Sequence, residues 1–171
     1  SYQQEMIGDD VFAGAEFDRT FRLYSMGGLG PNLDDMGHTL VAWMKNHFDE
    51  VSPRRVLDMG CTVGHSTLPY CDHFPEAEIH AIDVAATCLR YGHARAVAMG
   101  KEVHFSQQNA ERTNFENSSF DLIVSHAMMH ETSRRAIRAI YKECYRLLTP
   151  GGLMIQMDGI TPDKPFDKYY S

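Results

Sequence analysis

A glycine-containing turn follows the first compact apolar run of the sequence and has the clearest chemical potential. Residues 55–59 are predicted to form a strand that leads into Gly60, and Gly64 follows just before a predicted helix. Gly60 allows a tight turn, and Gly64 lets the helix and the strand approach closely. We expect this turn to present backbone N–H groups and a helix N-terminus to a bound ligand.

A carboxylate ends the second apolar run. Residues 79–83 are predicted to form a strand that ends in Asp83, 23 residues after Gly60. A carboxylate at this place can accept hydrogen bonds from the two vicinal hydroxyls of a ribose. A dinucleotide would need the pattern GxGxxG for its pyrophosphate, but Thr62 and His65 occupy the second and third glycine positions. The pattern therefore favours a nucleoside ligand other than a dinucleotide.

The elements that must position these residues alternate between short apolar runs and amphipathic stretches. This alternation predicts a doubly wound α/β fold with a mainly parallel sheet and right-handed crossovers. Ligands bind such sheets at the carboxyl ends of the strands. Strands are expected at 55–59, 79–83, 103–105, 120–125 and 153–157, and helices at 32–50 (capped by Asn32), 65–74, 86–99 and from Ser133 to the break at Pro150.

Five segments in this order resemble the motifs of the class I S-adenosylmethionine-dependent methyltransferases. They are the glycine turn after Asp58, the strand ending in Asp83, residues 108–111, residues 120–126, and the turn at 147–153. The resemblance covers about residues 40–159. It implies the Rossmann-like methyltransferase fold and S-adenosyl-L-methionine as cofactor, with S-adenosyl-L-homocysteine as product.

The resemblance also implies which residues hold the methionine part of the cofactor. The backbone of Gly60 and Cys61 would lie against it, Gly64 would support the turn, and Asp58 would lie beneath. Ser125 would offer its backbone carbonyl to the cofactor's amino group. The alternative for Asp58 is a cap of the turn, and the Cys61 side chain is expected to be inert.

The adenosine part would be held by residues that follow the second and third strands. The resemblance implies that Asp83 binds the ribose hydroxyls, Val84 packs on the adenine face, Asn109 meets the adenine amino group and the Ala110 N–H meets a ring nitrogen. The alternatives are a solvated strand-end acid for Asp83 and an ordinary loop residue for Asn109. The family usually has a glycine where Thr62 stands, and the Cβ of Thr62 would narrow the turn.

His126 and His130 are the candidate catalytic bases by location. A methyl group on a sulfonium is already electrophilic, so a base is needed only when the acceptor must lose a proton. On a helix these two histidines would share one face and could hold a metal, but no third ligand is evident, so no metal is predicted. Histidines that are simply buried or hydrogen-bonded are the alternative.

Composition and charge limit the classes of substrate that the chain is expected to bind. The chain has 171 residues, 16 Lys+Arg and 23 Asp+Glu, and its net charge of −7 argues against binding to nucleic acid or an anionic membrane. The four cysteines form no CxxC pair, which favours free thiols in a reducing cytoplasm. The segment after the fourth strand lacks the Asn/Asp-Pro-Pro-aromatic run of relatives that methylate nucleic acids. We therefore expect a cytoplasmic enzyme with a small-molecule acceptor at O, N or C.

The chain is predicted to divide into two regions. Residues 1–50 are predicted to be a helical extension or lid packed on the core, with Tyr24, Met26 and His38 either near the active site or packed on a short helix. Residues 51–171 are predicted to form the cofactor-binding core, which contains the glycine turn and the strands. The resembling fold has seven strands, and we expect strands six and seven to be missing. The fifth strand would then be an open edge.

A missing C-terminal segment, a partner chain or a second copy in a homodimer would cover that edge. The alternatives to an active enzyme are a non-catalytic cofactor-binding or scaffold domain and one domain of a larger biosynthetic enzyme. A nicotinamide oxidoreductase is the third class.

Overall fold

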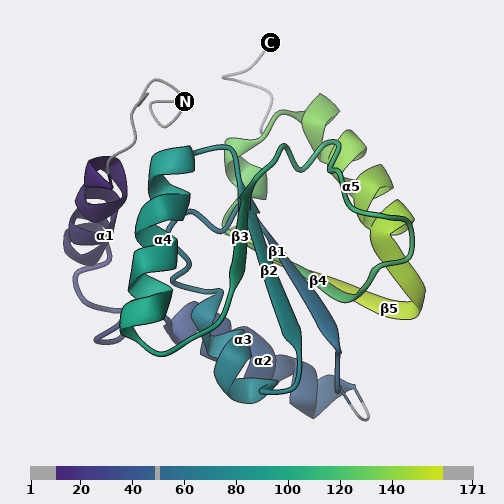
Figure 1. Ribbon diagram of the computed structural model, residues 1–171, viewed down its shortest axis with the longest axis horizontal. Coiled ribbons are helices and arrows are strands. Elements are labelled where there is room, and N and C mark those ends of the chain that lie inside the picture. The colour runs from purple at the N-terminus through teal and green to yellow at the C-terminus, as the bar shows by residue number, and fades with distance from the viewer. Residues whose placement is uncertain (1–10, 49–50, 160–171) are drawn as a thin grey trace.

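The computed structural model describes residues 11–48 and 51–159 and contains a five-stranded parallel sheet with helices on both faces (Figure 1). The strand order is β3-β2-β1-β4-β5, so the chain reverses its direction of growth between β1 and β4. Ligand sites of open α/β sheets lie at such a reversal. The strands are β1 (Arg55–Met59), β2 (Glu78–Asp83), β3 (His104–Gln107), β4 (Phe120–His126) and β5 (Leu148–Met157).

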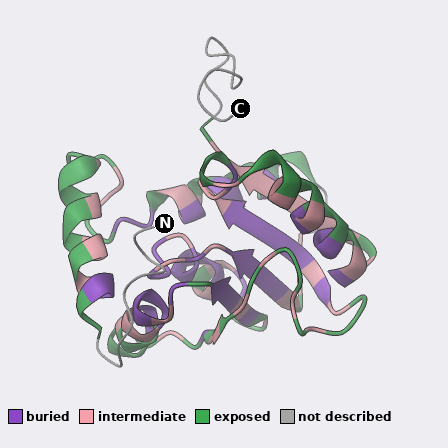
Figure 2. Cartoon of the chain, turned by 90° about the horizontal axis from the view of Figure 1, so that it is seen from above, coloured by how far each residue is buried: buried purple, intermediate pink, exposed green. Residues whose placement is uncertain are grey.

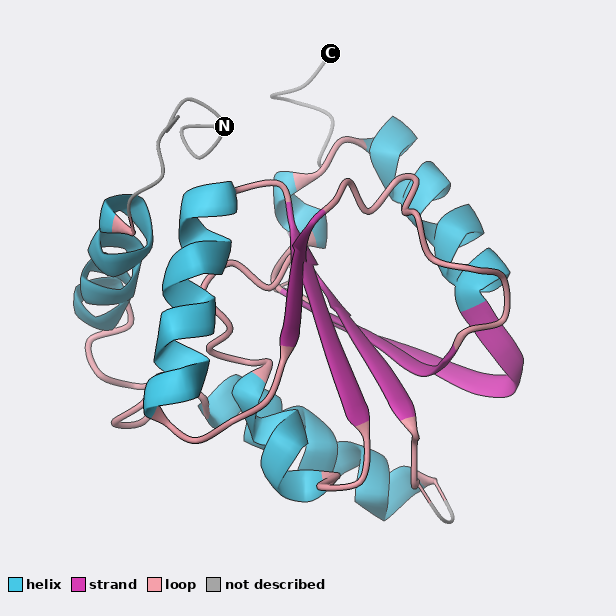
Figure 3. Ribbon diagram, in the orientation of Figure 1, coloured by secondary structure: helices cyan, strands magenta, loops and turns pink. Residues whose placement is uncertain are grey.

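Helices form one layer on each side of the sheet and a further helix outside one layer. Figure 1 shows α5 on one side, α2, α3 and α4 on the other, and α1 outside α4. Figure 3 shows that loops join the carboxyl ends of the strands to the helices that follow. The helices are α1 (Phe12–Tyr24), α2 (Asp35–His47), α3 (Leu68–His73), α4 (Ala86–Ala98), the short 3₁₀ helix η2 (Met129–Glu131) and α5 (Arg134–Leu147).

The alternation of side chains along each strand builds a core on each face of the sheet. In β1, Val56 packs with Leu40 of α2, whereas its neighbour Leu57 packs with Ile140 and Leu147 of α5. The central strands β1, β2 and β4 are mostly buried, whereas the residues of the edge strands β3 and β5 are partly buried or exposed (Figure 2). Because helices cover both faces, β1 and β4 carry nearly continuous apolar runs, as expected for a parallel sheet.

The predicted α/β architecture is confirmed, and two local predictions are wrong. Asn32 does not cap the second helix, since α2 begins at Asp35 and its N-cap residue is Asp34. The last strand begins at Leu148 rather than at residue 153, directly after α5. Ser133 caps α5 as predicted, by accepting a hydrogen bond from the Ala136 N–H at 3.2 Å.

The described residues leave several sequence predictions open. Within them β5 forms one edge of the sheet, and the two-part division at residue 50 stays a prediction although α2 shares a core cluster with β1. All four cysteines are free thiols. In the part of the chain that the structure describes, no helix has the length and apolar character to cross a membrane.

Candidate functional site

The glycine turn after β1 is fastened to the end of β2. The N–H groups of Gly60 and Cys61 donate to the Ile82 carbonyl at 2.8 and 3.1 Å, and the Thr62 N–H donates to Asp83 Oδ2 at 3.0 Å. The prediction that the N–H groups of this turn face a ligand is therefore wrong for these three residues. Their bonds instead fix the path of the turn.

Two glycines are required in this turn for distinct reasons. Gly60 has φ +78°, and a Cβ there would stand 2.5 Å from the Met128 sulfur. Gly64 also has φ +78°, and a Cβ there would stand 3.2 Å from the Phe105 ring. A side chain at either position would adopt an unfavourable backbone conformation, and it would clash with Met128 at Gly60 and press tightly on Phe105 at Gly64. Gly60 thus lies directly against the loop that follows β4.

Thr62 adopts the backbone conformation that a glycine would adopt more easily. Its φ is +50°, in the left-handed region that a β-branched residue rarely occupies. The family that the sequence resembles usually has a glycine at the position of Thr62. The positive φ of this residue is the physical reason why a glycine is favoured there. The turn accepts this strain because the Asp83 carboxylate and the Ile82 carbonyl hold it on both sides.

Asp83 organises the end of β2 and is nearly buried. Its Oδ1 accepts a hydrogen bond from the Ala85 N–H at 2.9 Å, and its Oδ2 accepts the bond from Thr62. Burial raises the pKa of this carboxyl from its usual value. Each carboxylate oxygen can accept a further hydrogen bond, so the predicted ribose contact fits this arrangement. The role of Asp83 in holding the turn was missed from sequence.

Asp58 lies at the end of β1 and is only 1% exposed. Thr67 Oγ1 donates to its Oδ2 at 2.6 Å, whereas its Oδ1 has no hydrogen-bond partner in the described residues. Burial raises the pKa of Asp58 to about 7. The carboxylate is therefore tied to Thr67, the residue before α3, through a side-chain hydroxyl, and the cap of a backbone N–H that was the alternative is not seen in the described residues. Its other oxygen is still available to a cationic or hydrogen-bond-donating ligand.

Unpartnered buried atoms also occur at the end of β4, the strand next to β1. Ser125 Oγ and His126 Nδ1 lack a hydrogen-bond partner within the described residues, as Asp58 Oδ1 does. Buried polar atoms without partners are rare in native proteins and require an explanation. A polar ligand at the carboxyl ends of β1 and β4 provides one, and these residues fit the methionine part of S-adenosylmethionine.

The two candidate bases lie in different environments, and they do not share a helix. His126 ends β4, is buried, and its Nε2 lies 3.1 Å from the Tyr70 hydroxyl. Burial lowers the pKa of His126 to about 4, so it is neutral at pH 7. His130 lies in η2 with a side chain that is 40% exposed.

Asp158 is a site residue that the sequence did not reveal. It follows β5, and its Oδ1 lies 2.7 Å from His130 Nδ1 while its Oδ2 accepts a hydrogen bond from the Met129 N–H at 2.6 Å. The Asp158 side chain is only 10% exposed. His130 lies on the segment after β4 whose Met128 side chain lies against Gly60, and Asp158 reaches it from the end of β5. An imidazole held by a carboxylate therefore stands next to the glycine turn.

The residues predicted to hold adenosine follow β2 and β3. Val84 leaves 40% of its surface exposed beside Asp83, and Gln107 Nε2 donates to the Val84 carbonyl at 2.9 Å. Asn109 is exposed, and its Oδ1 accepts a hydrogen bond from the Glu111 N–H at 2.9 Å, which is the loop role given as its alternative. Ala110 packs against the cluster beneath α5. The exposed Val84 side chain suits an apolar contact with a ligand ring.

The N-terminal helix is attached to the helical side of the glycine turn. Asp18 Oδ1 lies 2.5 Å from His65 Nε2, and its Oδ2 accepts a hydrogen bond from the Tyr91 hydroxyl at 2.9 Å. Phe21 stacks on the His65 ring at 5.6 Å between centroids. Tyr24 is 81% exposed at the far end of α1. The hydrogen bonds of Asp18 to His65 and Tyr91, rather than the aromatic stripe alone, therefore tie α1 to the residues behind the turn.

Neither the cysteine of the turn nor a metal-binding cluster offers further chemistry in the described residues. Burial raises the pKa of the Cys61 thiol well above its usual value, in agreement with an inert side chain. Within residues 11–48 and 51–159, no group of three or more His, Cys, Asp or Glu side chains is arranged to hold a metal ion.

Comparisons with known proteins identify the family. The family model described as a methyltransferase domain matches residues 56–152. A demethylmenaquinone methyltransferase of Thermus thermophilus is 30% identical over 125 residues, which cover 71% of this chain and 56% of that protein. A tRNA N(3)-methylcytidine methyltransferase of Drosophila melanogaster is 24% identical over 132 residues, covering 68% of this chain and 41% of that protein.

The solved structures agree with the fold. A crystal structure described as a putative S-adenosyl-L-methionine-dependent methyltransferase from Methanococcus maripaludis aligns with a TM-score of 0.70 and 17% identity, covering 90% of this chain and 65% of that one. At this identity the likeness concerns the fold alone. The chain spans about half the length of the curated relatives it matches.

Proposed function

This chain belongs to the class I S-adenosylmethionine-dependent methyltransferases, and we propose that it transfers a methyl group from this cofactor to a small-molecule acceptor at oxygen, nitrogen or carbon. One arrangement carries the proposal. The glycine turn is fastened to β2 by Asp83, and the unpartnered oxygen of Asp58 lies at the end of the neighbouring strand. When bound, S-adenosylmethionine supplies a methyl group that its sulfonium makes electrophilic.

The residues of the carboxyl edge would divide the cofactor between them. Asp83 would accept hydrogen bonds from the ribose hydroxyls, with Val84 against the adenine. Asp58 Oδ1 would attract the ammonium group of the methionine part, directly or through a water molecule, and the end of β4 at Ser125 would lie alongside. The protein's main contribution is then to fix the acceptor in line with the bond to be broken.

His130 is the better candidate for a base. Asp158 accepts the hydrogen bond of its Nδ1–H, and its Nε2, which lies 3.5 Å from the exposed Glu131 carboxylate, would accept a proton from the acceptor. The Asp158 carboxylate would stabilise the imidazolium that results. His126 is less suited, because Tyr70 engages its Nε2 and burial favours its neutral form. The Asp158 contact makes that residue a positioning residue for His130.

The nature of the acceptor is the finer part of the proposal. The acidic net charge favours a small molecule over nucleic acid. The matched relatives are named for different acceptors, a quinone precursor in one case and tRNA in the other. We therefore base the proposal of a small-molecule acceptor on two features of this chain. They are its acidic net charge and the lack of an Asn/Asp-Pro-Pro-aromatic run after β4.

Calorimetry on the full chain tests the cofactor part of the proposal. S-adenosylhomocysteine should bind the wild type and bind Asp83→Ala at least about tenfold more weakly, because two charge-assisted contacts are lost. Glu76→Ala removes the same charge from an exposed position and should leave the affinity unchanged. No binding heat with folded wild-type protein would refute the proposal.

A second experiment tests the reaction. Methyl-labelled S-adenosylmethionine is incubated with small molecules that bear hydroxyl, amine or acidic C–H groups, and with tRNA. Formation of S-adenosylhomocysteine that depends on a small molecule supports the proposal. Formation that depends on tRNA contradicts the acceptor class, and cofactor binding without any transfer would favour a non-catalytic domain.

A further inference from the structure

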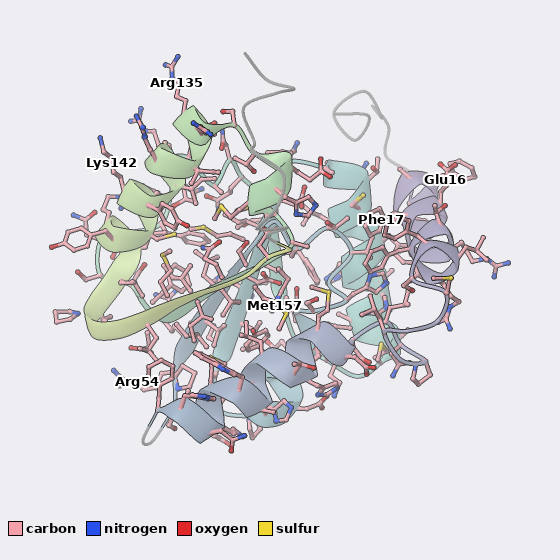
Figure 4. The ribbon with its side chains drawn as sticks, turned by 180° about the vertical axis from the view of Figure 1, so that it is seen from behind. Glu16, Phe17, Arg54, Arg135, Lys142 and Met157 are labelled. Atoms are coloured by element: carbon pink, nitrogen blue, oxygen red, sulfur yellow. The ribbon has the colours of Figure 1, made fainter. Side chains whose placement is uncertain are left out.

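The outer face of α5 carries a row of positive charges that pair with no acidic side chain among residues 11–48 and 51–159. Arg135, Arg138 and Lys142 are exposed, and their spacing places them on one side of the helix over about 10 Å. Figure 4 shows the labelled side chains of Arg135 and Lys142 pointing away from the fold. Among the described residues, none forms a side-chain hydrogen bond or ion pair with these three. We call them the α5 basic row.

The composition of α5 is unusual for a helix that only faces water. Its one acidic residue, Glu143, is buried and paired with Arg146 at 2.6 Å, so the exposed face has no acid to balance the row. The first turn of α5 contains no acidic residue, and Arg135 lies there, at the helix end whose dipole disfavours cations. In a chain with a net charge of −7, neither helix stability nor overall composition accounts for this row.

Two tyrosines complete the surface. Tyr141 is 45% exposed and Tyr145 is 86% exposed, and both lie beside the basic row on the same helix. Arginine and tyrosine are the residues enriched in protein–protein interfaces and their hot spots. Tyrosine provides rigid contact area, and the arginine guanidinium binds carboxylates through paired hydrogen bonds.

We propose that the α5 basic row is the docking surface for an acidic protein segment, such as a helix that carries carboxylates one turn apart. The row is a single ridge, which matches the spacing of side chains on another helix. The net charge of −7 disfavours a long polyanion such as RNA, which the chain as a whole would repel. Since α5 begins just after η2, a partner docked here would lie beside His130.

A peptide binding experiment tests this proposal. The probe is a labelled helical peptide of about 20 residues, with glutamates one turn apart along one face, and anisotropy reports its binding to the full chain. The peptide should bind at low salt and weaken as salt screens the charges. The triple variant Arg135→Gln, Arg138→Gln, Lys142→Gln should bind it about tenfold more weakly.

A matched triple variant controls for net charge. Arg19→Gln, Lys45→Gln, Arg54→Gln also removes two arginines and a lysine from exposed positions. Arg54 precedes the central strand β1 and lies at the other end of the fold from Arg135 (Figure 4). It should change the peptide affinity less than about twofold. Equal weakening by both triples, or by neither, would overturn the proposal.

Two competitors separate the remaining sources of negative charge. A single-stranded RNA of similar length and vesicles containing phosphatidylserine are tested against the bound peptide. Each competitor is compared with unlabelled peptide at equal concentration of negative charge. If the RNA or the vesicles displace the labelled peptide at a lower concentration of charge than unlabelled peptide does, the row binds that polyanion and the proposal is overturned. Both triples should keep the wild-type affinity for S-adenosylhomocysteine, so that a failure here is distinct from a failure of the proposed cofactor site.

Discussion

Replacing Thr62 with glycine should stabilise the protein, although the residue lies in the functional turn. A non-glycine residue in the left-handed region costs about 1–2 kcal/mol, and glycine gives back about 0.5–1 kcal/mol as greater freedom of the unfolded chain. The Thr62 N–H bond to Asp83 survives the change, because it comes from the backbone. We expect a net gain of about 0.5–1 kcal/mol in the free energy of unfolding, or about 1–4 °C in Tm.

Urea unfolding measures this gain, and two variants serve as controls. Thr62→Ala keeps the Cβ and the strained φ, so it should gain little. Ser118→Gly relieves the same φ of +50° at an exposed position far from the site, so it should gain a similar amount. S-adenosylhomocysteine should bind Thr62→Gly at least as tightly as the wild type. If Ser118→Gly is stabilised and Thr62→Gly is not, the strain argument for the turn is wrong.

Three further predictions concern the carboxylates and the base. Asp83→Ala should lower the free energy of unfolding by about 2–4 kcal/mol, because the Thr62 and Ala85 N–H groups lose their acceptors. Asp83→Asn should lower it by less, because the amide oxygen still accepts one of these hydrogen bonds. Urea unfolding distinguishes the two variants. Burial raises the pKa of Asp58 from 3.8 to about 7, so the folded chain holds a proton that the unfolded chain releases. The free energy of unfolding should therefore fall by on the order of 4 kcal/mol between pH 4 and pH 7. Asp58→Asn should remove this pH dependence, which urea unfolding at several pH values measures. With an acceptor that loses a proton, His130→Gln should lower kcat by about 10²–10⁴. Asp158→Asn should lower kcat while KM changes little, because it misplaces the imidazole without touching the substrate. Unchanged rates in both variants would eliminate the base.

The fold could be predicted because its signals are local. Short apolar runs separated by Gly, Pro and amphipathic stretches predict the first four strands and the helices α2 to α5 within about three residues of their observed bounds, whereas β5 begins five residues earlier than predicted and η2 was not predicted. The hydrogen bonds of the glycine turn could not be predicted in this way, because they depend on the parallel pairing that sets Met59 against Ile82. Asp158 reaches His130 for a similar reason, since the pairing of His126 with Met157 brings two segments together that lie about 30 residues apart in sequence.

Burial assigns distinct roles to the titratable groups at the carboxyl edge of the sheet. Asp58 is withdrawn from water at the end of β1, so its charge is costly unless a cation lies against its free oxygen. His130 is partly exposed and already has a carboxylate partner, so it can exchange protons with an acceptor that approaches from solvent. A buried titratable group and a partly exposed one can therefore serve one site in different ways, the first by binding a charge and the second by exchanging protons. The Asp58 oxygen therefore suits the fixed cation of a cofactor, and His130 suits the acceptor.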